Sequence, residues 1–462
     1  MSEITNLDAT SATATGNPKP AQSWLPGSVV SVAYRKIAFR LIPLLFLCYL
    51  AAYLDRVNIS FVKAQMQVDI GLSTAAYGIG AGIFFIGYFI FEVPSNLLMA
   101  RIGARKTLLR IMVLWGITSS LMMFVHEEWS FYLLRFLLGA FEAGFTPGII
   151  FFLSKWTPGR LRARYLSLFI TATAVAGLVG APFTGWTLTA LNGVAGLAGW
   201  QWTFLLQGIP PVVLGIVVFF VLPDTPREAR WLSTEQLAAV ETALAEDPEA
   251  AGGQHVRFAR ALHDWRTYAL SVAYFCISGG IFLVTFWLPT ALGQYKVEPQ
   301  LLGWLTAIPY LGAVVAMVIM GRLSDRFNER RWFIVIPLLI GAAALVATIY
   351  NTSSLTATIV CFTIGAAGIW SAFAVFWSVP PLFYTGVAAA GAIAVINSIG
   401  NLNGFVNPFI VGGIQTATGS LSGGLLLTVG GLLLGAIIVI FTVRRPDRRH
   451  SDVVKGAGIA AD

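Results

Sequence analysis

The chain has 462 residues, of which 56% are hydrophobic and 11% are charged, and its formal net charge is +8. An ordinary soluble domain has roughly 25% charged residues, which cover its water-facing surface. From Trp332 to Val443 the sequence contains no Asp, Glu, Lys, Arg or His. This composition excludes a soluble globular protein. It predicts a membrane-embedded one, because a charge in the bilayer core costs about 2.5–3.5 kcal/mol on insertion scales.

Apolar stretches long enough to cross a bilayer as helices recur along the whole chain. They predict an all-α integral membrane protein with twelve transmembrane helices. In chain order the predicted spans cover residues 38–62, 77–99, 107–125, 129–153, 165–190, 201–222, 267–292, 301–321, 332–350, 355–383, 388–415 and 422–443.

The Lys and Arg residues are distributed unevenly between the two sides of the predicted membrane. With a cytoplasmic N-terminus, all of them except Arg56, Lys63, Arg135 and Lys296 fall on the cytoplasmic side. By the positive-inside rule, this predicts that both termini are cytoplasmic. The excess of basic residues therefore indicates membrane topology and not a nucleic-acid-binding surface.

One long polar break, residues 223–266, separates two groups of six predicted spans. Ser233 and Gln236 form a capping-box pattern that predicts a short amphipathic helix, Leu237–Ala245. Pro182 and Pro408 occupy corresponding glycine-rich places in the two groups. Two such parallel repeats are typical of a transporter whose halves rock about a central site. The expected domains are a disordered cytoplasmic tail (1–36), a first bundle (37–222), a cytoplasmic linker (223–266), a second bundle (267–443) and a cytoplasmic tail (444–462).

No targeting peptide, disulfide or metal site is expected. The first 36 residues are polar and lack the apolar core of a cleaved signal peptide, so the first span is expected to direct insertion. The three cysteines lie in predicted spans as apolar fillers, and the four histidines lie in loops or tails without ligand spacing. No cofactor is expected.

Asp55 and Arg56 are two charges inside the first span. An interfacial position is the alternative, but residues 41–54 alone are too short to span, so the helix should continue past the pair. Counted from Arg40 at 1.5 Å per residue, Asp55 lies roughly 22 Å deep. Arg56 can hold a substrate carboxylate through a bidentate fork. Asp55 is the better proton carrier, because burial favours its neutral form and a nearby cation its charged form. An anion that draws Arg56 away would then promote protonation of Asp55.

The second and fourth spans carry further polar groups. Tyr88 and Glu142 reach a similar depth of roughly 20 Å. Arg135 and Glu142 are two turns apart on one helix face. Glu142 is predicted to be protonated during coupling, whereas Arg135 can make either a structural salt bridge or a substrate contact. Glu92 lies beside Pro94 near the inner mouth, which favours a gating or structural role.

The second half offers only neutral polar side chains. Asn397 and Asn401 are one turn apart and can bind substrate oxygens or satisfy backbone carbonyls at glycine-rich bends. Ser378, before Pro380, is a weaker candidate on a broken helix. The tyrosines of an organic-acid pocket combine a ring with a donor, although core packing explains many tyrosines equally well; the candidates are Tyr53, Tyr88 and Tyr310.

Several short motifs are similar to those of one known family. Gly321–Arg326 (GRLSDR) resembles the loop signature of the major facilitator superfamily, and Tyr53–Ser60 (YLDRVNIS) resembles its anion:cation symporter branch more narrowly. Further stretches complete the match over the chain apart from its tails: FEVPSN at 91–96, RFLLGAFEAG at 135–144, LPDTP at 222–226 and NSIGN at 397–401. Within the branch, the resemblance is strongest to bacterial carriers of tartrate, phthalate and hydroxyphenylacetate-type acids.

The resemblance implies roles for the matching residues. It implies that Asp55 and Glu142 are protonation sites, that Arg56 contacts an organic anion, and that the protein resides in a bacterial inner membrane. The loop charges Arg101, Arg105, Asp325 and Arg326 are expected to act in the inner gate. Ala100 stands where the superfamily has an aspartate, so the charge pairing should differ between the halves.

The predicted function is proton-coupled symport of a small organic anion by a monomeric carrier, with the proton as coupling ion. The anion is expected to be a tartrate-like hydroxy-dicarboxylate or an aromatic carboxylate. The alternative is an exchanger or facilitator without proton coupling. A membrane enzyme would require a nucleophile–base set or metal ligands at this depth, and no intramembrane histidine is present. A receptor would leave the repeat unexplained.

Overall fold

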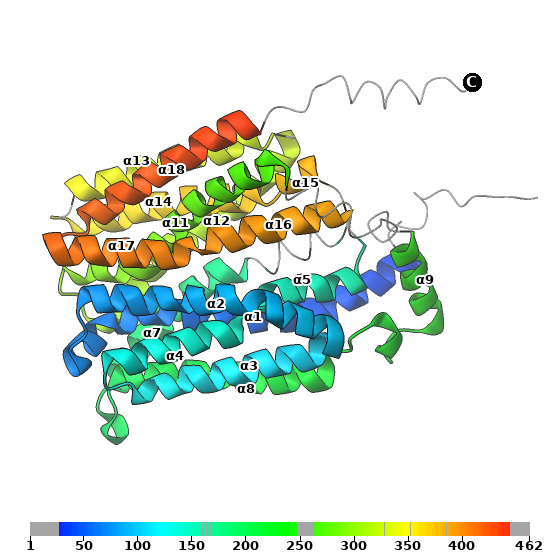
Figure 1. The fold of residues 1–462 in the computed structure, drawn as a ribbon, viewed down its shortest axis with the longest axis horizontal. Coiled ribbons are helices and arrows are strands. Elements are labelled where there is room, and N and C mark those ends of the chain that lie inside the picture. Colours follow the sequence, from blue (N-terminus) through cyan, green and yellow to red (C-terminus); the bar gives the residue numbers. More distant parts are fainter. Residues whose placement is uncertain are drawn as a thin grey trace, which may run out of the picture.

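The chain folds almost entirely into helices that run along one common direction (Figure 1). The computed structural model describes residues 27–158, 171–246, 263–327, 329–351, 353–384 and 386–443, together with Leu161, Tyr165 and Phe169. The first half contains α1 (Val29–Ile70), α2 (Thr74–Ile102), α3 (Ala104–Leu121), α4 (Glu128–Glu142), α5 (Phe145–Trp156), α7 (Ala172–Ala190) and α8 (Gly199–Val221). The second half contains α11 (Trp265–Gly293), α12 (Pro299–Phe327), α13 (Arg331–Tyr350), α14 (Leu355–Phe376), α15 (Pro380–Phe383), α16 (Gly386–Asn401), α17 (Asn403–Thr418) and α18 (Ser422–Thr442).

Ten stretches among the described residues are helical, long and apolar enough to cross a membrane. They match ten of the predicted spans. The other two predicted spans, 165–190 and 388–415, fall on α7 and on the pair α16 and α17. The first helix begins at Val29, inside the stretch expected to be a disordered tail, and its N-cap is the Ser28 side chain. Residues 1–26 and 444–462 lie outside the described part of the chain.

Three of the predicted spans are interrupted helices. The fourth span breaks at Gly144, whose φ of 86° separates α4 from α5 directly after Glu142. A side chain at Gly144 would also meet Ser95 Oγ at 2.5 Å, so this position requires glycine. The tenth span breaks between α14 and α15, which places Ser378 on a broken helix as predicted. The eleventh breaks at Leu402, directly after Asn401.

The two halves form separate bundles that lie side by side in Figure 1, the first half below and the second half above. Within the first half, α3 packs on α8 and α2 on α4; within the second half, α12 and α13 both pack on α14. Between the halves, α2 packs against α17 and α7 packs against α12. The two contacts between the halves correspond to each other, because each joins the second span of one repeat to the fifth span of the other.

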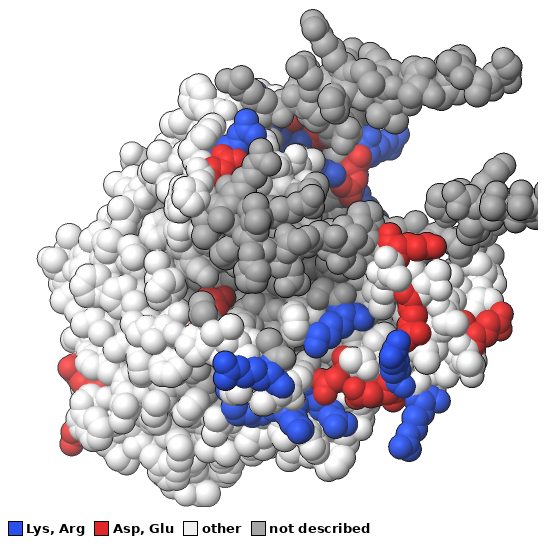
Figure 2. Space-filling view, turned by 45° about the vertical axis from the view of Figure 1, so that its right-hand side comes forward, with Lys and Arg blue, Asp and Glu red and all other residues white. Residues whose placement is uncertain are grey.

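The two ends of the molecule differ. We call the end that carries the 223–246 segment the linker end; it is the right-hand end in Figure 1, and the α1–α2 turn lies at the opposite end. Figure 2 shows that the Lys and Arg side chains of the described residues gather at the linker end, whereas the flanks are uncharged. This is the distribution that the positive-inside rule predicts for a cytoplasmic linker end.

At the opposite end the halves are in close contact through glycines. A Cβ at Gly78 of α2 would lie 2.5 Å from the carbonyl oxygen of Pro408 in α17. A Cβ at Gly303 of α12 would lie 2.5 Å from the carbonyl oxygen of Ala181 in α7. Backbones can approach this closely only where a side chain is missing. The opposite end of the molecule is therefore closed in this structure.

The linker attaches to the first half. Its helix α9 (Thr234–Ala245) has the predicted capping box, in which Ser233 Oγ accepts from the Gln236 backbone and Gln236 accepts from the Ser233 backbone. Trp231 stacks on Trp156 with ring centres 6.0 Å apart. The carbonyl of Trp231 accepts from Lys36 of α1, and the Arg40 guanidinium lies 4.9 Å from its ring. Residues 247–262 of the predicted linker lie outside the described part.

Candidate functional site

The strongest ion pair of the buried region joins Arg56 of α1 to Glu142 at the end of α4. Both Arg56 Nε, at 2.8 Å, and Arg56 Nη2 donate to the same oxygen, Glu142 Oε1. The side chains are 12% and 0% exposed, respectively. The other carboxylate oxygen, Oε2, is buried without a hydrogen-bond partner among the described residues. Glu142 Oε2 is therefore an atom beside the ion pair that can accept a proton without losing a hydrogen bond to the described residues.

Aromatic rings enclose the guanidinium of Arg56. It lies 5.4 Å from the centre of the Phe84 ring and 5.2 Å from that of Tyr88, both on α2. Such rings attract a cation through their negative faces. They keep Arg56 charged and in place if its carboxylate partner is exchanged for another anion.

Asp55 does not face Arg56. Successive residues on an α-helix point about 100° apart, and Asp55 turns toward α3, where Trp115 Nε1 and Ser119 Oγ donate to its two oxygens. A third hydrogen bond comes from Asn58 Nδ2 at 3.1 Å. In this structure the ion-pair partner of Arg56 is Glu142 and not its neighbour Asp55. Trp115, Ser119 and Asn58 are site residues that the sequence analysis missed.

Arg135 of α4 is completely buried near the Arg56–Glu142 pair. Its Nε donates to the carbonyl of Gly80 at 3.0 Å and its Nη2 to that of Ala81 at 3.1 Å, both in α2. Its guanidinium also lies 5.0 Å from the Phe84 ring, on which Arg56 packs. Nη1 has no partner among the described residues. In this conformation Arg135 thus fixes the backbone of α2 beside the Arg56 site and makes no salt bridge among the described residues, and its substrate contact stays a prediction.

The tyrosines predicted for a pocket are buried near the pair. Tyr53 and Tyr88 are 7% and 4% exposed. Tyr49, one turn before Tyr53, stacks on Phe169 with ring centres 4.1 Å apart. Tyr310 of α12 packs against Gly177 of α7, so it lies between the halves.

The second half presents an aromatic wall that the sequence did not indicate. Tyr274 of α11 is buried, and α11 packs against α1, the helix that carries Arg56. It stacks on Phe376 at 5.5 Å and meets Trp377 edge-on at 4.8 Å. Gly400 of α16 makes room for it, since a Cβ there would lie 1.9 Å from the Tyr274 ring. A ring facing the Arg56 side of the interface suits a partly apolar ligand.

The neutral polar candidates of the second half occupy different environments. Asn397 and Asn401 are half-buried on α16, the latter at the α16–α17 break. Ser378 Oγ donates to the Val375 carbonyl at 2.6 Å, which satisfies its own broken helix. Two asparagines that the sequence analysis missed, Asn403 and Asn407, donate to backbone carbonyls of α11, and their side-chain oxygens are buried without a partner among the described residues.

The predicted gating residues lie toward the linker end. Glu92 is 8% exposed and accepts a 3.1 Å hydrogen bond from Ser398 Oγ, which joins α2 to α16 across the two halves. Asp325 pairs with Arg330 at 2.6 Å, while Arg326 is exposed.

The corresponding place in the first half is built differently. There the linker residue Asp224 accepts from the Arg105 backbone N–H at 2.8 Å at the start of α3, and Arg101 is exposed. The two halves do differ here, and Asp224 supplies the carboxylate that Ala100 cannot.

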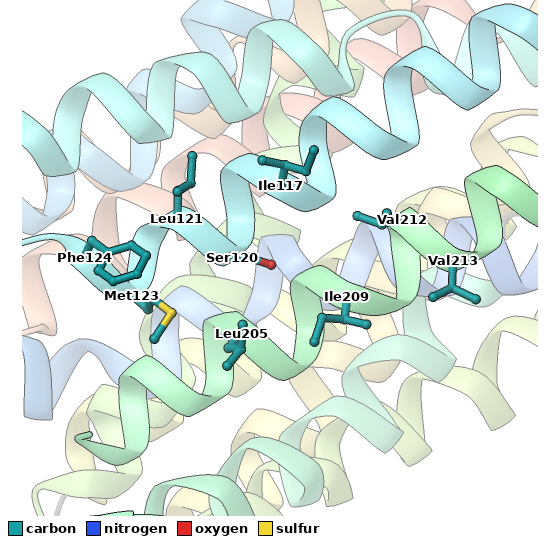
Figure 3. A pocket seen from close by; sticks show the side chains of 9 residues that line it. All are labelled: Ile117, Ser120, Leu121, Met123, Phe124, Leu205, Ile209, Val212 and Val213. Atoms are coloured by element: carbon teal, nitrogen blue, oxygen red, sulfur yellow. The ribbon is translucent and has the colours of Figure 1, made fainter. Parts of the chain in front are cut away.

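An apolar surface groove lies away from the Arg56–Glu142 pair. It has a volume of about 430 Å³ between α3 and α8, and apolar side chains such as Ile117, Phe124 and Ile209 line it (Figure 3). These three residues are each at least 46% exposed and lie on the uncharged flank of the molecule. Among the described residues, no group of three His, Cys, Asp or Glu side chains could hold a metal.

Comparisons with known proteins agree with this architecture. The Major Facilitator Superfamily profile matches residues 45–408 and, in a second match, 270–460. An Agrobacterium vitis protein named "Putative tartrate transporter" is 45% identical over 89% of this chain and 91% of its own length. The inner membrane transport protein RhmT of Escherichia coli is 36% identical over 90% of this chain and 96% of its own.

Solved structures share the fold. The D-xylose–proton symporter superposes with a TM-score of 0.70 at 16% identity, covering 88% of this chain and 98% of that one. A bacterial homologue of the human lysosomal transporter Spinster has a TM-score of 0.69 at 17% identity, covering 88% and 97%. The chain therefore belongs to the major facilitator superfamily and is a multi-pass membrane transporter, not an enzyme.

Proposed function

We propose that the protein is a proton-coupled symporter that takes up a small organic anion by alternating access. The buried Arg56–Glu142 pair is the observation that carries this proposal. A membrane-buried ion pair without a structural need marks a transport pathway more often than a scaffold. Its two members match the two ligands of a symporter, because an arginine binds an anion and a carboxylate binds a proton.

Coupling follows from the shared guanidinium. A substrate carboxylate that takes the Nε and Nη2 donors of Arg56 displaces Glu142 Oε1, which accepts from both in the structure. Glu142 would then be an unpaired buried charge, which is costly, and it avoids that cost by taking up a proton. Oε2, which has no partner among the described residues, is the atom available for it. The anion and the proton therefore promote each other's binding.

Asp55 is the second protonation site of the scheme. Its three donors suit an ionised carboxylate, which only accepts hydrogen bonds. Protonation would require one of these donors to rearrange, and Ser119 can do so by rotating its hydroxyl. Asp55 thus connects a change of protonation to the packing of α1 against α3.

The class of anion follows from the two walls. The first half provides a guanidinium, and the second half provides rings such as Tyr274 and half-buried amides at Asn397 and Asn401. A small carboxylate that also bears hydroxyls or an aromatic ring fits both. Relatives whose names refer to tartrate favour a tartrate-like acid, and the aromatic wall favours an aromatic one. We further propose that the carrier works as a monomer in a bacterial inner membrane, with both termini cytoplasmic and no cofactor besides the coupling proton.

Uptake into proteoliposomes tests the proposal. Tartrate, phthalate and 4-hydroxyphenylacetate would each be supplied with and without an inward proton gradient. Accumulation of at least one acid above its external concentration, abolished by a protonophore, is expected. Uptake that only equilibrates, or that occurs only in exchange for internal anion regardless of pH, would show an exchanger or facilitator in place of a symporter.

A further inference from the structure

Lys63 of α1 is a buried cation that the coupling scheme does not use. Its side chain is 5% exposed. The ammonium lies 4.3 Å from the centre of the Trp287 ring and 4.9 Å from that of Tyr77, and it donates to Thr290 Oγ1 at 3.4 Å. No acidic side chain pairs with it within the described part of the chain. Two rings and a hydroxyl therefore surround this charge without neutralising it.

These contacts connect the two halves at the closed, opposite end. Lys63 and Tyr77 belong to the first half, whereas Trp287 and Thr290 belong to α11 of the second. The Tyr77 and Trp287 rings also meet each other edge-on, with centres 6.0 Å apart. When the halves part at this end, Lys63 keeps Tyr77 but loses Trp287 and Thr290. Its ammonium then faces the opening without a counter-charge.

Lys63 and Arg56 lie on the same face of α1. They are seven residues apart, which is two helical turns, or about 10 Å along the axis. Lys63 is the nearer of the two to the opposite end. An anion that enters between the parted halves from this end thus meets Lys63 before Arg56.

We propose that Lys63 is an anion-docking residue of the opposite-end entrance, which binds the carboxylate of an incoming organic anion and transfers it to Arg56. The Tyr77 hydroxyl, buried with no hydrogen-bond partner among the described residues, is a second donor at this position. In the closed state the Trp287 ring takes the place of the anion against the ammonium. The inference rests on the proposed function, since it concerns the same substrate.

Transport from each side separately tests this role. The full chain would be reconstituted in vesicles with the linker end facing either in or out, and the labelled probe would be tartrate or 4-hydroxyphenylacetate, whichever the wild type carries. Lys63→Met is expected to raise the half-saturating concentration at least tenfold for entry from the opposite end and less than twofold for entry from the linker end. Lys63→Arg should stay within threefold of wild type. Lys296→Met, which removes an exposed cation at the same end, is the matched control and should behave as wild type.

A docking role and a packing role give different results. Equal rises of the half-saturating concentration from both sides, or a lower maximal rate with both concentrations unchanged, would overturn the inference. If Lys63→Met lowers the unfolding temperature, Lys63→Gln replaces it. In that case, added salt should raise the half-saturating concentration for entry from the opposite end in the wild type and not in the variant. A wild type that carries none of tartrate, phthalate and 4-hydroxyphenylacetate contradicts the proposed function. A wild type that carries one of them while Lys63→Met and Lys63→Gln match it contradicts this inference alone.

Discussion

Glu142→Gln separates anion binding from proton binding at the proposed coupling pair. Glutamine has the shape of glutamate but no charge and no exchangeable carboxyl proton. In the wild type, the anion competes with Glu142 Oε1 for two donors of Arg56, at 2.8 Å for Nε and through Nη2. In the variant that competitor is weakened. We therefore expect substrate binding to persist and proton-driven accumulation to disappear.

The size of the effect follows from the two hydrogen bonds. A hydrogen bond to a charged group contributes about 1.5–3 kcal/mol, and about 1.4 kcal/mol corresponds to a factor of ten in affinity. Losing the charge on the competing acceptor should lower the substrate Kd about tenfold or more at alkaline pH. Without substrate, the variant leaves Arg56 as an uncompensated cation at 12% exposure, which destabilises the fold by about 3 kcal/mol. Saturating anion should restore part of that loss, because it supplies the missing charge.

The assay combines binding, counterflow and accumulation in the same preparation. Wild-type binding takes up a proton, so its affinity should fall as pH rises, whereas the affinity of Glu142→Gln should not depend on pH. Counterflow should survive in the variant and accumulation should not. Glu128→Gln, at an exposed position of the same helix, is the matched control. Gradient-driven accumulation by Glu142→Gln, or an unchanged pH dependence of its Kd, would refute the assignment.

Four further outcomes follow from the same geometry. Asp55→Asn should lose gradient-driven accumulation in proteoliposomes and keep substrate binding, because the amide cannot carry the proton; full concentrative uptake would exclude that role. Arg56→Lys should bind substrate about tenfold or more weakly by equilibrium titration, since an ammonium cannot form the bidentate fork; unchanged affinity would move the carboxylate site elsewhere. The methyl ester of a transported acid should fail to compete for uptake, and equal competition would contradict anion docking. Gly78→Ala should slow net transport, because its Cβ would lie 2.5 Å from the Pro408 carbonyl, whereas Gly430→Ala, which has open space, should not; equal rates would mean that close contact there is not required.

Much of the fold follows from the sequence because a bilayer imposes strong rules on composition. Apolar runs predict the spans, and the Ser233–Gln236 box predicts α9, since both depend on local pattern. The breaks after Glu142 and Asn401 were not predicted. Each break depends on a close approach of distant segments, such as Ser95 against Gly144, and a single sequence does not show which glycine is needed for that purpose.

The sequence draws attention to the buried charges but does not show how they pair. A charged residue inside a predicted span is rare because its insertion costs free energy. Asp55, Arg56 and Glu142 could therefore be selected from the sequence. Their partners depend on how the helices rotate about their axes. Asp55 turns to Trp115 and Ser119, and these ordinary residues of a span carried no signal. The aromatic wall at Tyr274 was missed for the same reason.

Net charge at the pair gives a physical reason for obligatory coupling in the proposed scheme. Without ligand, Arg56 and Glu142 neutralise each other within the first half. With both ligands, Arg56 and a monocarboxylate anion form a neutral pair while Glu142 is protonated; a dicarboxylate brings one more negative charge and would need a second proton, for which Asp55 is the proposed site. With the anion alone or the proton alone, one uncompensated charge remains, and closing the halves over it would require its burial at low dielectric. The whole pair lies in the first half, so reorientation of the halves need not break it. Among its described residues, the second half presents no charged side chain to the pair and can move over the site whenever the charges there balance. In this scheme only the empty carrier and the carrier with both ligands therefore reorient readily between the two sides of the membrane. This restriction is the condition for symport.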